Sequence, residues 1–333
     1  RGTWPMKLKK SILLHGIVLL ILILVSLSIG RYNIEFKEVI KTLFNMDASF
    51  QDFNLLMNIR IPRVLLVVIG GGALALSGMV FQSIFQNPLI SPDVLGVTSG
   101  CSLGAVVAIV LFSSSTILLQ VMSFVFGIGA VIFSMLLSKN MKSNKVLALV
   151  ISGIVTGAIA SAFIMIFKYF ADPYKELPAI DFWLMGGFYN SSWSKVVIVF
   201  ILTLISSLVL FLVRWQLKVL TMGDTQAKLL GVNVNAIRIV AILAATLLVS
   251  AVVSVAGVVS WIGILAPHIV KSYSKDDISK IMPTTLLMGG ILMIIADTIA
   301  RTISTTEIPI SILTSLVGAP FLVYLLCRKK GLV

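Results

Sequence analysis

Long apolar runs, separated by short polar segments, extend through most of this chain. A helix that crosses a bilayer needs about 20 mostly apolar residues, and ten such stretches are predicted. The predicted spans are Ser11–Gly30, Pro62–Phe85, Val94–Phe112, Thr116–Ser138, Val146–Phe170, Ser194–Trp215, Ile237–Ala256, Val258–Ser272, Ile281–Thr302 and Ile310–Cys327. The eighth is short and follows directly from the seventh through Gly257. The pattern predicts an all-α polytopic membrane protein with both termini on one side.

The segments between the apolar runs differ in charge. If the N-terminus is cytoplasmic, the inner segments carry 17 basic and four acidic residues, whereas the outer segments carry nine of each. Cytoplasmic loops are enriched in Lys and Arg, so both termini are predicted to be cytoplasmic. The net charge of +13 then reflects topology and not nucleic-acid binding. A single domain, residues 1–333, is expected. Residues 1–5, which precede Met6, are not used to predict the fold.

Composition supports a location in the cell membrane. Hydrophobic residues make up 58% of the chain and charged residues 12%, against about 25% charged in soluble domains. The two cysteines lie far apart and predict neither a disulfide nor a metal site. Outside the spans, short helices are predicted around Phe36–Phe44 and at Leu177–Met185.

Enzymatic motifs are missing. The chain has no G-x-x-x-x-G-K-[ST] loop for a nucleotide and no H-E-x-x-H metal motif. Its many serines lack plausible His or Asp partners, so no catalytic residue, metal or cofactor is predicted. Asp297, with Arg301 at i+4, has two interpretations: an intramembrane carboxylate with a transport role, or a boundary ion pair, which is favoured. An ion-coupled secondary transporter would need Asp297.

Glycine and proline mark two breaks in the helical pattern. Gly70–Gly72 and Gly78 are small residues that let helices approach closely. Pro88 and Pro92 interrupt the helix that follows, and Gly257 marks a similar break later in the chain. Backbone groups freed at such breaks must be satisfied by protein or by a water-filled cavity. A tight turn and a pathway lining both remain open.

A short polar segment, Thr221–Val234, separates two predicted spans on the cytoplasmic side. Asp224 is predicted to cap a helix N-terminus, and Gly231 to end that helix with a positive φ. Ala227 and Leu230, at i and i+3, are expected on one face. A two-turn helix is marginal alone in water, so this one is predicted to pack against a partner.

The outer ends of two spans carry arginines at positions 60, 63 and 301. The guanidinium group presents a rigid fork of donors that suits carboxylates. Two interpretations stand for Arg60, Arg63 and Arg301: interfacial anchoring by snorkelling, or a docking site for an acidic external partner.

These motifs together resemble the FecCD family of ABC importer permeases for iron-siderophores, haem and cobalamin. The resemblance extends from about Arg60 to Arg328. It rests on Arg60-Ile-Pro-Arg63, Gln86-Asn-Pro-Leu-Ile-Ser-Pro-Asp-Val-Leu-Gly-Val-Thr-Ser-Gly100, Gly223-Asp with Leu230-Gly-Val, Trp261-Ile-Gly-Ile-Leu-Ala-Pro-His268 and Ala296-Asp-Thr-Ile-Ala-Arg301 with Glu307-Ile-Pro309. Trp261 and Ala266 stand where Phe and Val or Ile are expected, and count as tolerable packing changes.

The resemblance implies a type II importer permease with ten helices per subunit, arranged as a homo- or heterodimer. Two cytoplasmic ATPase subunits and an extracytoplasmic substrate-binding protein are the implied partners. Arg60, Arg63 and Arg301 would meet carboxylates of the binding protein. Residues 219–236 would form the coupling helices that contact the ATPase, with Gly223, Asp224, Ala227, Leu230 and Gly231 as the coupling residues. The cytoplasmic gate would include Asn87, Pro88, Leu89, Ser143 and Asn144.

The predicted function is import of an iron chelate, with a ferric siderophore as the favoured cargo. The same machinery importing haem or cobalamin is the nearest alternative, because the lining residues do not separate these cargoes. An ion-coupled secondary transporter is the alternative from another class. It would work without an ATPase.

Overall fold

A computed structural model describes residues 6–30, 32, 34–43, 50–112, 115–141, 144–274, 278–304 and 306–328. Within these ranges every regular element is helical. The elements are α1 Met6–Ser28, α2 Phe36–Leu43, α3 Phe50–Leu55, the π-helix η1 Leu56–Arg60, α4 Ile61–Ile84, the 3-10 helix η2 Pro92–Leu95, α5 Val97–Leu111, α6 Thr116–Lys139, α7 Lys145–Phe170, α8 Glu176–Met185, α9 Trp193–Leu212, α10 Arg214–Leu220, α11 Asp224–Leu229, α12 Val234–Ala256, α13 Ile262–Tyr273, α14 Ile278–Thr302 and α15 Ile310–Arg328.

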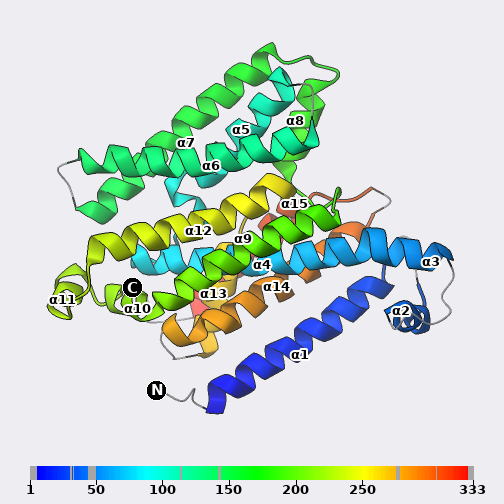
Figure 1. The fold of residues 1–333 in the computed structure, drawn as a ribbon, viewed down its shortest axis with the longest axis horizontal. Helices are drawn as coiled ribbons and strands as arrows, with labels where there is room; N and C mark the ends of the chain where they lie inside the picture. The colour runs from blue at the N-terminus through cyan, green and yellow to red at the C-terminus, as the bar shows by residue number, and fades with distance from the viewer. Residues whose placement is uncertain are drawn as a thin grey trace.

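The long helices lie side by side along the length of the molecule. One end carries the start of α1 together with α10 and α11, and the opposite end carries α2, α3 and α8 (Figure 1). In the positive-inside orientation, these are the cytoplasmic and the outer ends. Helix α4 passes through the centre and contacts α9, α12, α13 and α14, while α5, α6 and α7 form a group on one side.

Seven helical segments in the described residues are long and apolar enough to cross a membrane. They are Lys9–Ser28, Gln51–Ile84, Thr116–Lys139, Lys145–Phe170, Trp193–Leu212, Val234–Ala256 and Ile278–Thr302. Helices α5 and α15 are shorter and apolar. The predicted all-helical membrane fold is confirmed, whereas the number of ten spans stays a prediction.

Glycine contacts hold the centre of the molecule together. A Cβ atom on Gly71 would overlap the backbone of Gly289 in α14, and one on Gly78 would overlap the carbonyl of Gly263 in α13. Only residues without a side chain allow these helix axes to come so close. The predicted packing role of these small residues is confirmed.

The eighth predicted span is wrong in its first part. Residues 258–261 are not helical, and α13 begins only at Ile262. Gly257 and Trp261 both have a positive φ, +67° and +72° respectively, which a helix cannot contain. With 12 residues, α13 is about 18 Å long, so the extended segment before it supplies the rest of the crossing.

Three other boundaries also differ from the predictions. The second span begins earlier, because α3 and η1 continue without a gap into α4. The third is divided into η2 and α5 by Gly96, whose φ is +76°. The sixth ends at Leu212, after which α10 forms a separate short helix. The two short outer helices are confirmed as α2 and α8, although position 44 lies outside the described residues.

A pair of glycines after α8 joins three elements at the outer end. The amide of Gly187 donates to the carbonyl of Ala256 at 2.7 Å, and the amide of Ile310 donates to the carbonyl of Gly186 at 3.2 Å. The end of α8 is therefore bonded through the backbone to the end of α12 and to the start of α15.

Candidate transport and coupling sites

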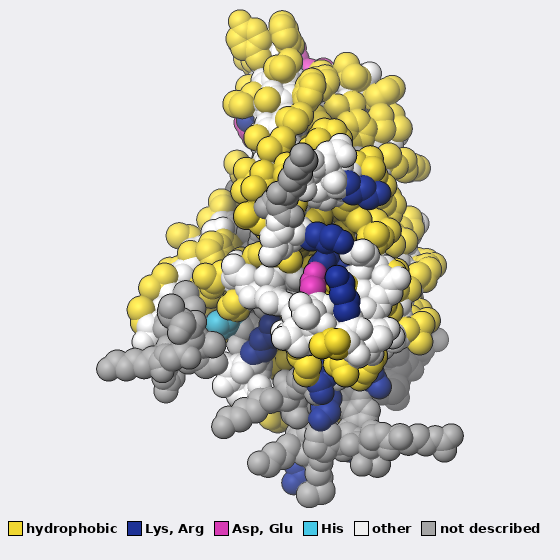
Figure 2. Space-filling view, turned by 90° about the vertical axis from the view of Figure 1, so that its left-hand side faces the viewer, with side chains coloured by type: hydrophobic (Ala, Val, Ile, Leu, Met, Phe, Trp, Pro, Cys, Tyr) yellow, Lys and Arg dark blue, Asp and Glu magenta, His cyan; other side chains and the backbone are white. Residues whose placement is uncertain are grey.

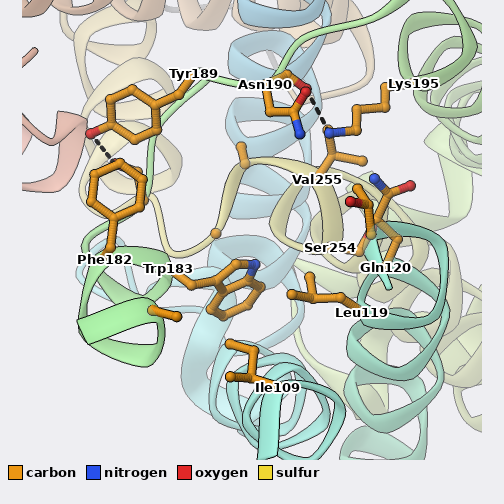
Figure 3. A pocket seen from close by; sticks show the side chains of 16 residues that line it. Ile109, Leu119, Gln120, Phe182, Trp183, Tyr189, Asn190, Lys195, Ser254 and Val255 are labelled. Atoms are coloured by element: carbon orange, nitrogen blue, oxygen red, sulfur yellow. Dashed lines mark hydrogen bonds between the residues drawn. The ribbon is translucent and has the colours of Figure 1, made fainter. Parts of the chain in front are cut away.

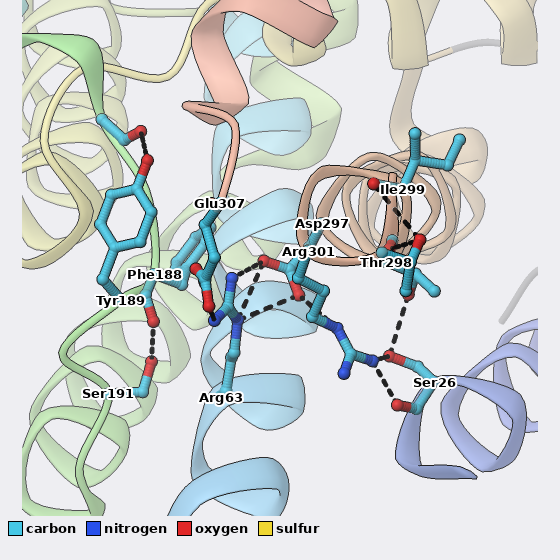
Figure 4. Close-up of polar contacts among 12 residues, drawn as sticks. Ser26, Arg63, Phe188, Tyr189, Ser191, Asp297, Thr298, Ile299, Arg301 and Glu307 are labelled. Carbon is cyan, nitrogen blue, oxygen red and sulfur yellow. Dashed lines mark hydrogen bonds and ion pairs between the residues drawn. The ribbon is translucent and has the colours of Figure 1, made fainter. Parts of the chain in front are cut away.

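The outer end contains a buried ion-pair cluster centred on Arg63 (Figure 4). Its guanidinium lies between Asp297 of α14 and Glu307 of the segment before α15. The Arg63–Asp297 and Arg63–Glu307 pairs each have a shortest distance of 2.9 Å. Side-chain exposure is 1% for Asp297 and 24% for Glu307. The Nε, Nη1 and Nη2 atoms of Arg63 all donate to these two carboxylates. Carboxylates are planar and negatively charged, so each can accept two hydrogen bonds from a guanidinium group.

The other two outer arginines also have partners within the chain. Arg60 donates to the backbone carbonyls of Leu27 and Tyr32, and Arg301 donates to the carbonyl and hydroxyl of Ser26. These bonds connect α1 to η1 and α14. All three arginines line one cavity of about 210 Å³ beside Glu307, so the structure brings the predicted docking residues together.

The favoured interpretation of Asp297 needs correction. Its closest charged partner is Arg63, from a helix far away in sequence, and the i+4 pair with Arg301 is longer at 3.5 Å. Asp297 has no exposed surface and joins α4 to α14. Tyr189 lies close to Glu307 (Figure 4); burial and then the negative charge of Glu307 raise the pKa of this phenol, which keeps it neutral.

A second cavity at the outer end lies between α5, α6, α8 and the end of α12 (Figure 3). Its volume is about 270 Å³. Trp183 and Leu119 form apolar walls, and the amino group of Lys195 donates to the carbonyl of Asn190 at 2.5 Å. The cavity places one buried ammonium group near the short helix α8.

The two breaks in the helical pattern meet inside the molecule. A cavity of about 220 Å³ is lined by η2 and its flanks on one side and by the extended segment before α13 on the other. Its polar lining residues are Ser91, Asp93, Thr98 and Ser260. Asp93 accepts a 2.9 Å hydrogen bond from the Thr98 amide. Non-helical backbone within a membrane is tolerated where it lines a cavity, and a pathway lining at this cavity stays a prediction.

Trp261, at the second break, connects this cavity to α15. Its indole NH donates to the hydroxyl of Ser315 at 3.1 Å, and its ring packs against Gly318. A left-handed φ is costly for a residue with a large side chain. The contacts with α15 hold the ring in place, so this residue has a larger role than the tolerable packing change that the sequence predicted.

At the cytoplasmic end, α11 projects beyond the long helices, whereas α10 packs against them (Figure 1). Figure 2 shows this end, where Lys and Arg side chains gather around an acidic side chain. Asp224 of α11 pairs with Arg238 of α12 at 2.7 Å. After α11, the amide of Gly231 donates to Lys228 and that of Val232 donates to Ala227. This is the Schellman arrangement, and Gly231 has the predicted positive φ, +76°.

Two details of the coupling segment were predicted incorrectly. The residue at the N-cap position is Gly223, with φ +106°, and Asp224 lies in the first turn. Its carboxylate pairs with Arg238 in place of capping. Ala227 is fully buried, whereas Leu230 is 54% exposed, so the two do not share a packing face. The residues 219–236 include one complete helix, α11, with the ends of α10 and α12.

The predicted gate residues make local backbone contacts. The side-chain oxygen of Asn87 accepts from the Leu89 amide at 2.9 Å, and Pro88 and Leu89 are exposed. The side-chain oxygen of Asn144 caps α7 by accepting from the Val146 amide at 3.0 Å. Ser143 lies outside the described residues. The gate role stays a prediction for all five residues.

The profile of the FecCD transport family matches residues 18–328 of the chain. The chain belongs to this family. Among relatives of this FecCD chain, the molybdate import system permease protein MolB of Haemophilus influenzae is 35% identical over 324 residues, which cover 96% of each chain. The hemin transport system permease protein HmuU of Yersinia pestis is 33% identical and covers 94% of each chain.

A solved structure supports the fold of this FecCD chain. A metal-chelate type ABC transporter in an inward-facing conformation superposes with a TM-score of 0.88 at 33% identity, covering 96% of this chain and 100% of that one. The FecCD chain is therefore an ABC importer permease, a multi-pass protein of the cytoplasmic membrane. It is a transport subunit, and ATP hydrolysis belongs to partner ATPase chains.

Sequence reasoning missed several residues of the FecCD chain that the structure brings into these sites. Glu307 and Asp93 each belong to a motif shared with the family, but neither is predicted from the sequence as a site residue. Gln86 donates from its side chain to the carbonyl of Leu220 at 3.0 Å and so joins the Asn87 turn to α10. The charge of Glu307, two residues before Pro309, was a usable signal, whereas nothing in the motif that begins with Gln86 indicates its bond to α10.

Proposed function

We propose that this FecCD chain imports an iron chelate, with a ferric siderophore as the cargo, and works as one of two permease subunits. The observation that carries the transport proposal is the meeting of the two broken helices at a cavity that contains Asp93. Transporter sites are commonly formed by discontinuous helices that meet near the middle of the membrane. The cargo class follows from the metal-chelate transporter that the fold resembles and from the hemin relative.

Transport would proceed by alternating access. Two ATPase subunits would act on the coupling segment, in which Gly223, Asp224, Ala227, Leu230 and Gly231 shape α11. The Asp224–Arg238 pair would carry movement of α11 to α12, and the Gln86 bond would carry movement of α10 to the Asn87 turn. A switch of this kind needs two packings that ATP biases differently.

Docking of a substrate-binding protein would occur by exchange of carboxylates. Arg63 already has two carboxylate partners, so an acidic residue of the binding protein has to displace one. Glu307 is the one to be displaced, because its side chain is 24% exposed and that of Asp297 is 1% exposed. Since Glu307 lies just before α15, its release would free the start of that helix.

A second candidate cargo is molybdate, because MolB is 35% identical over nearly the whole chain. Molybdate is a small oxyanion, whereas ferric siderophores and hemin are large complexes. The permease cavities do not select among them, and cargo choice would depend mainly on the binding protein.

Uptake by cells that lack the chromosomal copy tests the cargo. Cells complemented with this permease would receive radiolabelled ferric siderophore, hemin or molybdate, with and without an inactivating substitution in the partner ATPase. We expect ATPase-dependent accumulation of the ferric siderophore. Accumulation of molybdate alone would overturn the cargo assignment, and accumulation of any cargo without an active ATPase would favour a secondary transporter.

A further inference from the structure

A fourth cavity, of about 490 Å³, lies at the cytoplasmic end between α6, α7 and α12. Its charged lining residues are all basic: Lys139 at the end of α6, Lys145 at the start of α7, and Arg238 in α12. Ser138 and Asn235 add neutral polar groups. The cavity is thus strongly positive at the level where the inner leaflet of the membrane carries its headgroups.

Arg238, at the closed side of this cavity, has unused donors. The residue is 5% exposed, and only its Nη2 atom has a partner, the carboxylate of Asp224. Its Nε and Nη1 atoms are buried and lack an acceptor in the described part of the chain. A buried guanidinium NH without an acceptor loses its hydration and gains nothing in return. An anion bound in the cavity would stabilise the positive charge of Arg238 through space, beyond what its pair with Asp224 supplies.

The two lysines lie at the open side. Lys139 and Lys145 are exposed, and the amino group of Lys145 donates to the neutral side chain of Asn235 at 2.7 Å. No carboxylate of the described residues forms an ion pair with either lysine. Three cations therefore line one cavity. Asp224, the acidic partner of Arg238, does not line it.

The walls of the cavity are apolar, and apolar surface continues outside it. Met135, Leu149 and Ile242 line the interior. Exposed side chains on α6 and α7 continue from there, among them Leu136 and Leu147, at 53% and 52% exposure. A phosphate group with acyl chains attached matches this combination of a basic cavity and an adjoining apolar surface. A free phosphate would have no use for the apolar surface.

We infer that this cavity binds the phosphate headgroup of an anionic phospholipid from the inner leaflet. Basic pockets between membrane helices on the cytoplasmic side are suited to such headgroups. Lys139 and Lys145 would hold the phosphate from the open side, and Arg238 would attract it from the closed side. Arg238 also pairs with Asp224, so the lipid and α11 share one guanidinium group. The lipid site does not depend on the proposed cargo.

Native mass spectrometry of the permease purified with its ATPase tests the site, with phosphatidylglycerol as the probe. The double variant Lys139→Gln, Lys145→Gln removes two of the three cations. The matched control, Lys9→Gln, Lys10→Gln, removes the same charge from the cytoplasmic end of α1, where both lysines are exposed. We expect phosphatidylglycerol retention to be roughly 30-fold weaker in the cavity variant and unchanged in the control.

Three results would overturn the proposal. One is equal loss of lipid in both double variants, since that indicates general surface charge. Another is full retention in the cavity variant. The third is binding of inorganic phosphate in the cavity at concentrations that leave phosphatidylglycerol unbound, since the source is then a soluble anion. Gel filtration and thermal unfolding of both variants establish that folding is intact before lipid is measured.

Discussion

The two ends of this permease use basic residues in opposite ways. At the outer end, Arg60, Arg63 and Arg301 are nearly buried, and each is bonded within the chain. At the cytoplasmic end, Lys139 and Lys145 are exposed without acidic partners in the described residues, and Arg238 keeps two donors without acceptors. Charge at the outer end fixes helix packing, whereas charge at the inner end is available to an anion. A partner that docked on these arginines would therefore have to displace bonds that they already make within the chain.

The largest effect is expected from Asp297→Asn. The substitution leaves Arg63 and Arg301 without their shared buried carboxylate, and breaking a buried pair costs about 3–5 kcal/mol. Thermal unfolding in detergent should show a marked loss of stability. Asp181→Asn is the control, because its pair with Lys168 is exposed, at 45% for the Asp side chain, and such pairs contribute at most about 1 kcal/mol. Equal effects would remove the contrast between buried and exposed charge.

A smaller effect, on coupling more than on folding, is expected from Gly231→Val. No atom lies within 4 Å of a Cβ at this position, so the obstacle is the φ of +76° alone. A side-chain residue in this region costs about 1–2 kcal/mol, which would distort the turn after α11. ATP-driven uptake should fall several-fold while the amount of permease in the membrane changes little. Gly231→Asn, which tolerates this backbone region, should keep most of the uptake.

Glu307→Gln tests the exchange of carboxylates at the outer end. The amide holds Arg63 more weakly than a carboxylate does, so an acidic residue of the binding protein should displace it more easily. We expect a several-fold tighter complex with the binding protein in surface plasmon resonance. Arg63→Lys, which loses the fork, should weaken the same complex. Weaker docking by the Glu307 variant would mean that Glu307 positions Arg63 for docking and is not displaced.

The smallest effect is expected from Asp224→Asn. The Asn side chain can still accept a hydrogen bond from Arg238, but the Arg238 side chain is only 6% exposed and loses its anionic partner, so the free energy of unfolding should fall by about 1 kcal/mol. The released Arg238 should bind phosphatidylglycerol a few-fold more tightly, and uptake per ATP hydrolysed should fall. Native mass spectrometry and paired uptake and ATPase assays measure the two outcomes. Unchanged lipid retention would separate Arg238 from the lipid site.

Much of the fold followed from local patterns. Apolar length predicted the spanning helices, and Gly71 and Gly78 predicted close packing, because both signals depend on neighbouring residues only. The eighth span failed for the same reason. Residues 258–261 are nearly as apolar as the helix that follows, so their pattern does not reveal that the helix is interrupted there, with positive φ values at Gly257 and Trp261.

The sites were predictable only in part. The sequence indicated Arg60, Arg63 and Arg301 as a group through family resemblance, but their partners come from distant segments, such as Ser26 and Glu307. Asp297 showed the limit clearly, since its i+4 neighbour was the visible partner and its main partner, Arg63, is 234 residues away in the chain. The basic cavity between α6, α7 and α12 has no sequence motif, because its lining residues come from three separate helices.

The glycine pair that follows α8 has a mechanical consequence. Its two amide–carbonyl bonds connect the end of α8 to the end of α12 and to the start of α15. A force applied to α8 from outside would therefore be transmitted both to the non-helical segment before α13 and to the first turn of α15. A Cβ atom on Gly186 would lie 2.0 Å from the carbonyl oxygen of Val258, and the φ there is +66°, so a side chain at this position would break the connection.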